Sequence, residues 1–201
     1  MSYRLGLDAL NLRPTDRLAH TEYCDHAELI RAVTGLPDGS MYAPAFCDKW
    51  HIDLRFHTNN GPVRWHDRGR VTDMGHAAYV EHGADKSLPQ TCPFTDPEQV
   101  LAFDAVDEYG LPDFESLVEY YENDYDRGQR AHPESVLPGG YYRTMVSGAI
   151  ETFGWEMLLL AAADLDRFDK VLDSFFRLTM HHVKAWARTS IECFICHDDM
   201  V

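Results

Sequence analysis

The sequence contains no hydrophobic run long enough to cross a membrane as a helix. Its longest apolar stretch, Met157 to Ala163, is far shorter than the ~20 residues that a membrane span requires. The N-terminal residues also lack the basic segment and the apolar core of a secretion signal. We therefore expect a cytoplasmic protein with no membrane partner.

Positive charge is scarce as well. Lysine and arginine number 18 against 33 aspartates and glutamates, which gives a formal net charge of -15. Because binding to phosphate groups needs clustered basic side chains, this balance argues against nucleic acid and anionic membranes as partners. The five cysteines form an odd set, so we expect reduced thiols rather than a disulfide framework.

The apolar content suffices for one globular domain, with 45% hydrophobic and 12% aromatic residues in a chain of 201. Helical spacing of apolar residues is clearest from Asp164 to Thr189. Further helices are predicted at residues 3–12, 25–34, 97–103, 113–130 and 155–163. Strands are predicted at Leu18–Tyr23, Trp50–Phe56, Tyr141–Ala149 and Ile191–Cys196. Strands separated by helices indicate parallel βα units, and thus the α/β class.

Several segments carry a family resemblance through their order along the chain. Residues 10–18 read Leu-Asn-Leu-Arg-Pro-Thr-Asp-Arg-Leu, and residues 146–154 read Val-Ser-Gly-Ala-Ile-Glu-Thr-Phe-Gly, which is similar to a Gly-x-Pro-x-Thr strand end. The long helix from Asp164 follows, and then Ile195-Cys196-His197-Asp198-Asp199. In this order the segments resemble the uroporphyrinogen decarboxylase superfamily, which includes corrinoid-linked methyltransferases.

The resemblance implies a (β/α)8 TIM-barrel fold in which residues 1–201 are the N-terminal part of a single barrel domain. Such a barrel usually needs ~250 residues, so the chain is expected to be truncated after about four βα units. When complete, the protein would act on a small-molecule substrate as a decarboxylase or a corrinoid-linked methyltransferase. The Arg-Gln-Ala-Gly-Arg segment of true decarboxylases is absent, and residues 20–24 read His-Thr-Glu-Tyr-Cys instead.

Cofactors and partners follow from the same resemblance. In the methyltransferase relatives, residues of later strands bind zinc, and a corrinoid protein supplies the methyl group. No cofactor or metal is therefore expected in this chain itself. A corrinoid protein or a second half-barrel chain is the expected protein partner. The 201-residue chain alone is expected to be inactive and to bind neither zinc nor haem in stoichiometric amount.

Candidate site residues are those at the carboxyl ends of predicted strands, because the active sites of βα barrels form there. Asp198, Asp199 and His57 are the predicted catalytic residues, and Glu151 and Thr152 are predicted to bind substrate. The two aspartates could equally form a solvated turn that caps the next helix. His57 could be an ordinary turn histidine, and Glu151 could cap a helix.

The loop around residues 68–76 adds two further candidates. Arg70 and His76 could grip a substrate carboxylate and supply a group that titrates near neutral pH. The alternative is a polar hairpin without a functional role.

Cys193-Phe194-Ile195-Cys196-His197 matches the C-x-x-C-H pattern of covalent haem c attachment. A c-type haem carrier is therefore an alternative, although haem attachment would need export. Zinc on the same three side chains would need Cys193 and Cys196 on one face of a strand, where alternation places them on opposite faces. His197 is also a predicted substrate-binding residue. The remaining alternative is a non-catalytic interaction subunit or a truncated product.

Overall fold

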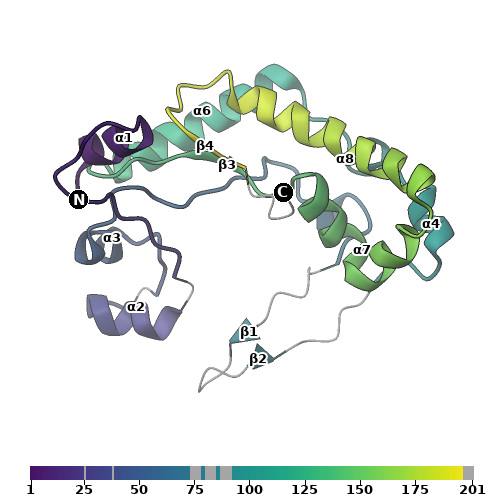
Figure 1. Ribbon diagram of the computed structural model, residues 1–201, viewed down its shortest axis with the longest axis horizontal. Coiled ribbons are helices and arrows are strands. Elements are labelled where there is room, and N and C mark those ends of the chain that lie inside the picture. The colour runs from purple at the N-terminus through teal and green to yellow at the C-terminus, as the bar shows by residue number, and fades with distance from the viewer. Residues whose placement is uncertain (25, 38, 73–77, 80–84, 87–91, 197–201) are drawn as a thin grey trace. The chain divides into compact units, whose positions relative to one another are not determined.

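A computed structural model of the chain describes residues 1–24, 26–37, 39–72, 78–79, 85–86 and 92–196, and helices dominate it (Figure 1). The chain divides into two compact units. Unit 1 comprises residues 1–58, 122–139 and 191–195. Unit 2 comprises residues 59–121, 140–190 and 196–201.

Unit 1 carries three short helices: α1 (Tyr3–Leu10), α2 (Ala27–Thr34) and α3 (Pro44–Trp50). α2 and α3 pack side by side (Figure 1). α2 ends because Gly35 adopts a left-handed conformation with φ 72°, and α3 begins with Pro44, whose fixed φ suits a first helical turn. Three elements contribute residues to both units: α6 (Phe114–Ala131), β3 (Gly139–Tyr141) and β4 (Phe194–Cys196).

The fully buried carboxylate of Asp53 gathers hydrogen bonds from three places in unit 1. Its oxygens accept from the backbone N–H groups of Ser2 at 2.7 Å and His20 at 2.9 Å. The Arg17 guanidinium adds two bonds of 2.6 and 2.8 Å. Burial by itself would raise the pKa of the Asp53 carboxyl, but the bonds from Arg17, His20 and Ser2 lower the pKa below its ordinary value. Asp53 therefore ties the N-terminal residues to the segment that follows α3.

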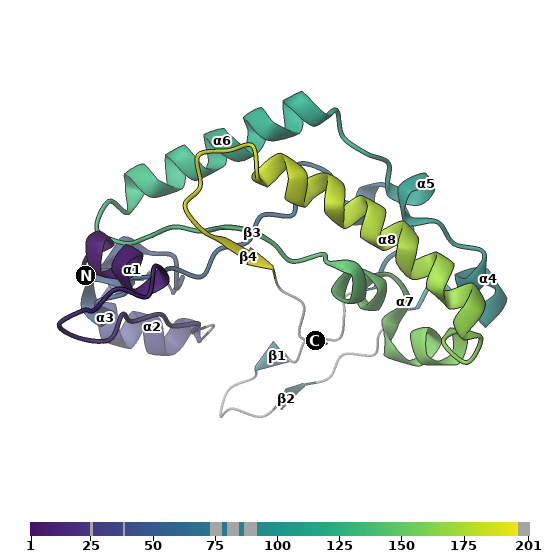
Figure 2. The same cartoon turned by 45° about the horizontal axis from the view of Figure 1, so that its top comes forward.

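Unit 2 is built mainly from helices. Its own elements are η1 (Trp65–Asp67), β1 (Ala78–Tyr79), β2 (Asp85–Lys86), α4 (Pro97–Leu101), α5 (Ala105–Tyr109), α7 (Met145–Ala161) and α8 (Leu165–Trp186). α8 packs along α7, α4 and α5 (Figure 2). The side chains of Asp96, Asp104 and Asp164 cap α4, α5 and α8 by accepting backbone N–H groups of the first turn.

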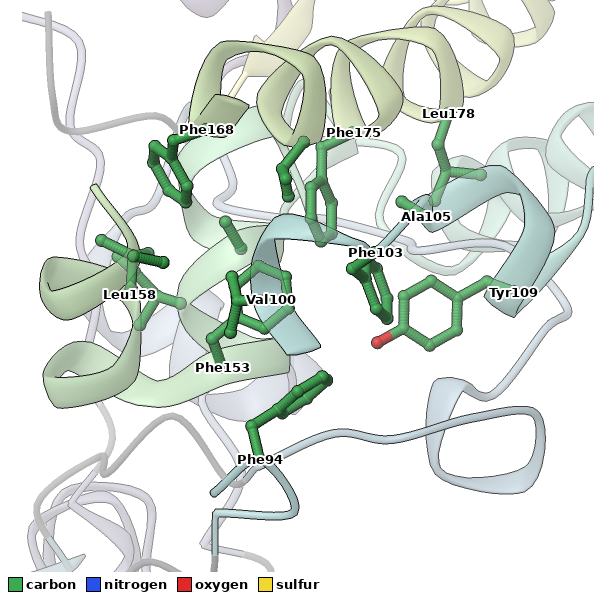
Figure 3. Close-up of a cluster of buried hydrophobic side chains, with 14 of the residues drawn as sticks. Phe94, Val100, Phe103, Ala105, Tyr109, Phe153, Leu158, Phe168, Phe175 and Leu178 are labelled. Carbon is green, nitrogen blue, oxygen red and sulfur yellow. The ribbon is translucent and has the colours of Figure 1, made fainter. Parts of the chain in front are cut away.

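Aromatic rings from these helices form the core of unit 2 (Figure 3). Phe103, between α4 and α5, packs edge-on against Phe153 of α7 at a centroid distance of 5.1 Å. It stacks on Phe175 of α8 at 5.8 Å. Phe153 and Phe175 are each at most 1% exposed. Full burial of such a side chain stabilises a fold by roughly 1.5–3 kcal/mol, so this cluster holds the helices together.

α7 breaks at Gly154, where the backbone has φ 71° and ψ 163°. Only glycine adopts these angles readily, because a Cβ atom would clash with the backbone. Every residue from 147 to 153, in the first arm of the helix, is buried. The second arm exposes Trp155 and Leu159, whose accessible fractions are 46% and 63%.

A buried histidine lies among the aromatic side chains of unit 2. His182 of α8 is 2% exposed, its Nδ1 shares a 2.7 Å hydrogen bond with the Tyr121 hydroxyl, and its ring stacks on Tyr141 at 4.6 Å. Burial, with smaller contributions from the nearby His181 and Arg143, lowers the pKa of His182 to about 3. The imidazole is therefore neutral in the folded chain at physiological pH.

The expected fold class is wrong. The described residues form mostly helices, and their strands have only two or three residues each. β1 and β2 pair antiparallel, and β3 and β4 form a separate parallel pair. The described part of the chain thus holds no set of strands for a truncated (β/α)8 TIM barrel, and its class is helical rather than α/β.

Two of the predicted strands do not form within the described part of the chain. In the segment Leu18–Tyr23, Leu18 is 90% exposed and Tyr23 is 59% exposed, so no buried face stabilises a strand. The segment Trp50–Phe56 begins inside α3 and then makes one isolated bridge, at Leu54.

The other two predicted strands survive only as short pieces. Tyr141 is the last residue of β3, and the apolar residues that follow start α7 at Met145. A short apolar run that is buried on all sides fits a helix as well as a strand, and here the helix forms. The strand at Ile191–Cys196 is reduced to β4. The helices predicted at residues 3–12, 97–103, 113–130 and 164–189 correspond to α1, α4, α6 and α8.

Replacing Asp53 by Asn should destabilise unit 1 by about 2 kcal/mol, because the amide cannot accept from all the donors and leaves buried N–H groups unpaired. Urea unfolding at pH 7 measures the change. Asp8→Asn removes a carboxylate that pairs with Arg4 and Arg13 on the surface of the same unit, and should cost less than about 1 kcal/mol. Equal losses in the two variants would contradict the central role given to Asp53.

His182 should make the chain less stable in acid. Between pH 6.5 and about 3 the unfolded chain binds a proton on His182 that the folded chain does not, so the free energy of unfolding falls as the pH is lowered through this window. His182→Phe should reduce the slope of stability against pH near pH 5 by at most about 1.4 kcal/mol per pH unit. Tyr121→Phe retains the imidazole and should keep the slope. An unchanged slope in His182→Phe would refute this assignment.

Candidate functional site

A cavity of about 340 Å³ in unit 1 is lined by several charged and titratable side chains. Volumes of this order suit small-molecule ligands. Its lining residues come from the loops around α3 and from α6 and the segment after it: Tyr42, Arg55, His57, Thr58, Asp124, Arg127, Gly128, His132 and Leu137.

Backbone pairing fixes where Arg55 enters this cavity. The N–H of Arg55 donates to the carbonyl of Val136 at 2.9 Å, and the N–H of Val136 donates to the carbonyl of Asp53 at 2.8 Å. Leu54 and Val136 thereby form a parallel bridge. Because successive residues of an extended segment point to opposite sides, Asp53 and Arg55 share one side and Leu54 takes the other.

Arg55 is a buried cation without a carboxylate partner. The residue is only 5% exposed, and its NH1 group donates to the sulfur of Cys47 at 2.9 Å and to Nδ1 of His132 at 2.6 Å. Its NH2 group donates to the carbonyl of Tyr42 at 3.2 Å, whereas its buried Nε–H group has no hydrogen-bond partner. No carboxylate of the described residues lies within ion-pair distance. Burial lowers the pKa of the Arg55 guanidinium, because desolvation disfavours the charged form.

His132 lies directly after α6 and is held at the cavity by its neighbours. Its N–H bonds to the carbonyls of Gly128 and Gln129 at 3.2 Å each, and its own carbonyl accepts from the Gln129 amide at 2.9 Å. Burial and the adjacent positive charge of Arg55 lower the pKa of His132 to about 4. The His132 imidazole is therefore neutral at pH 7.

A second histidine of the cavity is paired with a carboxylate. Nε2 of His57 lies 3.2 Å from Oδ2 of Asp124, and Oδ1 of Asp124 accepts a 2.6 Å bond from Arg127. The Asp124 side chain is 14% exposed and that of His57 is 25% exposed. A carboxylate that accepts from one ring nitrogen fixes the tautomer of the neutral imidazole and leaves the other nitrogen, Nδ1, as its hydrogen-bond acceptor.

Three of the predicted site residues serve the packing of unit 2. Glu151 accepts two bonds from the Arg143 guanidinium, at 2.8 and 2.9 Å, in a buried ion pair. Thr152 is fully buried and donates to the carbonyl of Gly148 at 2.8 Å. The Arg70 guanidinium bonds to Glu108 at 3.2 Å and lies over the ring of Phe94. These contacts favour a structural role for Arg70, Glu151 and Thr152.

The predicted catalytic residues Asp198 and Asp199 lie outside the described residues, as do His76 and His197. Of the C-x-x-C-H pattern, the structure describes both cysteines. Burial, and to a smaller extent the negative charge of the nearby Glu192, raises the pKa of the Cys193 thiol. Cys196 is exposed. His57 is the one predicted catalytic residue that the structure describes, and it lines the cavity of unit 1.

The comparisons with known proteins found no match. No protein-family model matches the chain, and no curated protein or solved structure matches it either. Within the described residues, no three His, Cys, Asp or Glu side chains are grouped so that they could hold a metal ion. None of the described helices is both long enough and apolar enough to span a bilayer.

Of the arginine, histidine and aspartate side chains that line the cavity, four were not predicted as site residues: Arg55, Asp124, Arg127 and His132. For Arg55 a signal exists in the sequence, since Asp53 and Arg55 alternate with Ile52, Leu54 and Phe56, and a charge within such a segment indicates a buried polar role. Asp124 is one of several acidic residues on α6, and nothing in its spacing separates it from the others.

The imidazole of His132 should titrate at about pH 4 in the folded chain, as measured by NMR on ¹⁵N-histidine-labelled protein. Arg55→Met should raise this pKa toward the ordinary value of 6.5, because the neighbouring positive charge is removed while the burial remains. Arg31→Met removes an exposed arginine of the same unit, which bonds to Pro37, and should leave the titration unchanged. A His132 pKa that does not respond to Arg55→Met would show that the contact between the two side chains is not formed.

Proposed function

We propose that the chain binds a small carboxylated molecule in the Arg55 cavity, and that His57 exchanges a proton with this ligand. The observation that carries the proposal is the buried Arg55 guanidinium, which lines the cavity and has no carboxylate counter-charge among the described residues. Burying a cation without a partner is costly, so an anion that enters the cavity gains a large share of its binding energy there.

A carboxylate suits this position better than a cation or a neutral ligand. Arg55 and Arg127 bring two positive charges to the cavity and Asp124 brings one negative charge, although the whole chain has a net charge of -15. The planar guanidinium matches the two oxygens of a carboxylate, and bonds between charged partners are about twice as strong as neutral ones.

Decarboxylation is the narrower reaction that we propose, in line with the superfamily that the sequence resembles. In this reaction the bond between a carbon atom and its carboxylate breaks, CO₂ leaves, and the electron pair left on carbon takes a proton. Arg55 would anchor a carboxylate that stays on the ligand, and protonated His57, supported by Asp124, would supply the proton through Nδ1. The ligand would then carry at least two carboxylates, one for anchoring and one that leaves.

The methyltransferase reaction remains the alternative within that superfamily. It depends on zinc and on a corrinoid partner, and none of the described residues is assigned to either. A non-catalytic interaction subunit differs from both enzymes in an observable way, because it would need no small ligand in this cavity.

Isothermal titration of the 201-residue chain with succinate and with tricarballylate tests the binding step. We expect saturable binding of both, with no heat from succinamide, which has the shape of succinate but no charge. Arg55→Met should weaken binding by about tenfold to a hundredfold, the range for bonds between charged groups. Arg31→Met, the exposed control in the same unit, should bind as the unmodified chain does.

The stability of Arg55→Met must be measured alongside its affinity. We expect its free energy of unfolding to change by less than about 1 kcal/mol, since the loss of three hydrogen bonds is offset by relief of the desolvated charge. A folded Arg55→Met chain that binds tricarballylate as tightly as the original would refute the proposed function. So would the absence of carboxylate binding by the unmodified chain.

A further inference from the structure

His132 of the cavity has a tautomer that its neighbour Arg55 determines. Arg55 NH1 lies 2.6 Å from Nδ1 of His132. A guanidinium has donors only, so Nδ1 must be the acceptor and the single proton of the neutral ring must reside on Nε2. Among the described residues, no side chain or backbone group forms a hydrogen bond with His132 Nε2.

This arrangement differs from that of His57 in the same cavity. The Nε2 atom of His57 lies 3.2 Å from a carboxylate oxygen of Asp124. His132 faces the Arg55 guanidinium instead, and no carboxylate of the described residues lies within ion-pair distance of its ring. One cavity thus contains a histidine that contacts a carboxylate and a histidine that contacts a guanidinium.

We infer that His132 is a ligand-contacting residue that donates its Nε2–H group to a carboxylate or carbonyl oxygen of the bound molecule, and that Arg55 is the positioning residue that fixes its tautomer. The inference rests on the proposed function and adds to it a specificity for ligands with an acceptor oxygen beside the anchored carboxylate. A neutral donor is suited to this task, because it polarises an oxygen without transferring its proton.

Two amide substitutions separate the two nitrogens of the ring. In His132→Asn the amide oxygen can replace Nδ1 as the acceptor for Arg55, but no group reaches the position of Nε2. In His132→Gln the longer side chain places an amide N–H group near the position of Nε2. We expect His132→Asn to weaken tricarballylate binding by about tenfold, and His132→Gln to bind within about threefold of the unmodified chain.

The tautomer is measured independently of any ligand. Long-range ¹H–¹⁵N spectra of the histidine-labelled chain at pH 7 should show the His132 proton on Nε2, with the resonance identified by its loss in His132→Asn. Arg55→Met should produce a mixture of the two tautomers, a change that a purely structural arginine would not cause. Arg31→Met should leave the spectrum unchanged.

Each outcome has one reading. A proton on Nδ1 of His132 in the free chain overturns the inference. So does binding that is equally tight in His132→Asn, His132→Gln and the unmodified chain, and that result leaves the proposed function intact. If the unmodified chain binds no carboxylate, the proposed function and the ligand contact of His132 both fall, whereas the tautomer spectrum still decides the role of Arg55.

Discussion

The hydrogen bonds at Asp53 fix the backbone segment on which the candidate site depends. Its carboxylate accepts from Ser2, Arg17 and His20, and its carbonyl accepts from Val136, which in turn receives the N–H of Arg55. The position of the Arg55 side chain is therefore set by a residue that does not line the cavity. The two charges also differ: the Asp53 carboxylate accepts hydrogen bonds from Ser2, Arg17 and His20, whereas the Arg55 guanidinium has no carboxylate partner among the described residues. A buried charge without a counter-charge lowers stability, and such groups are common where a protein trades stability for function.

The helices could be predicted from the sequence where an apolar stripe repeats at helical spacing, as in α8, or where a clear capping residue precedes the helix, as in α4. The strands could not. The run after Tyr141 shows no clear strand alternation or helical stripe, and periodicity alone does not distinguish a buried helix from a buried strand. The family resemblance also favoured a strand at Tyr141–Ala149. The structure contradicts that strand, because Met145–Ala149 belong to the first arm of α7.

The candidate site could likewise be predicted only in part. His57 was found from its place just beyond an apolar segment. Its partner Asp124 lies 67 residues away, and the contact between Arg55 and His132 spans 77 residues. Such pairs depend on how distant segments meet, which local patterns do not encode. Two chemically identical side chains of the cavity thus have different surroundings, because one imidazole faces a carboxylate and the other faces a guanidinium.

The break at Gly154 also determines what the surface of α7 presents. The exposed side chains of the second arm, Trp155, Leu159 and Leu160, keep their outward directions only while the backbone holds its positive φ. A Cβ atom at position 154 would drive the chain toward ordinary dihedral angles, and the second arm would rotate about the first. The apolar stripe would then point elsewhere without any change in its own residues. The direction in which α7 offers apolar area is thus encoded by one backbone torsion rather than by the side chains that supply that area.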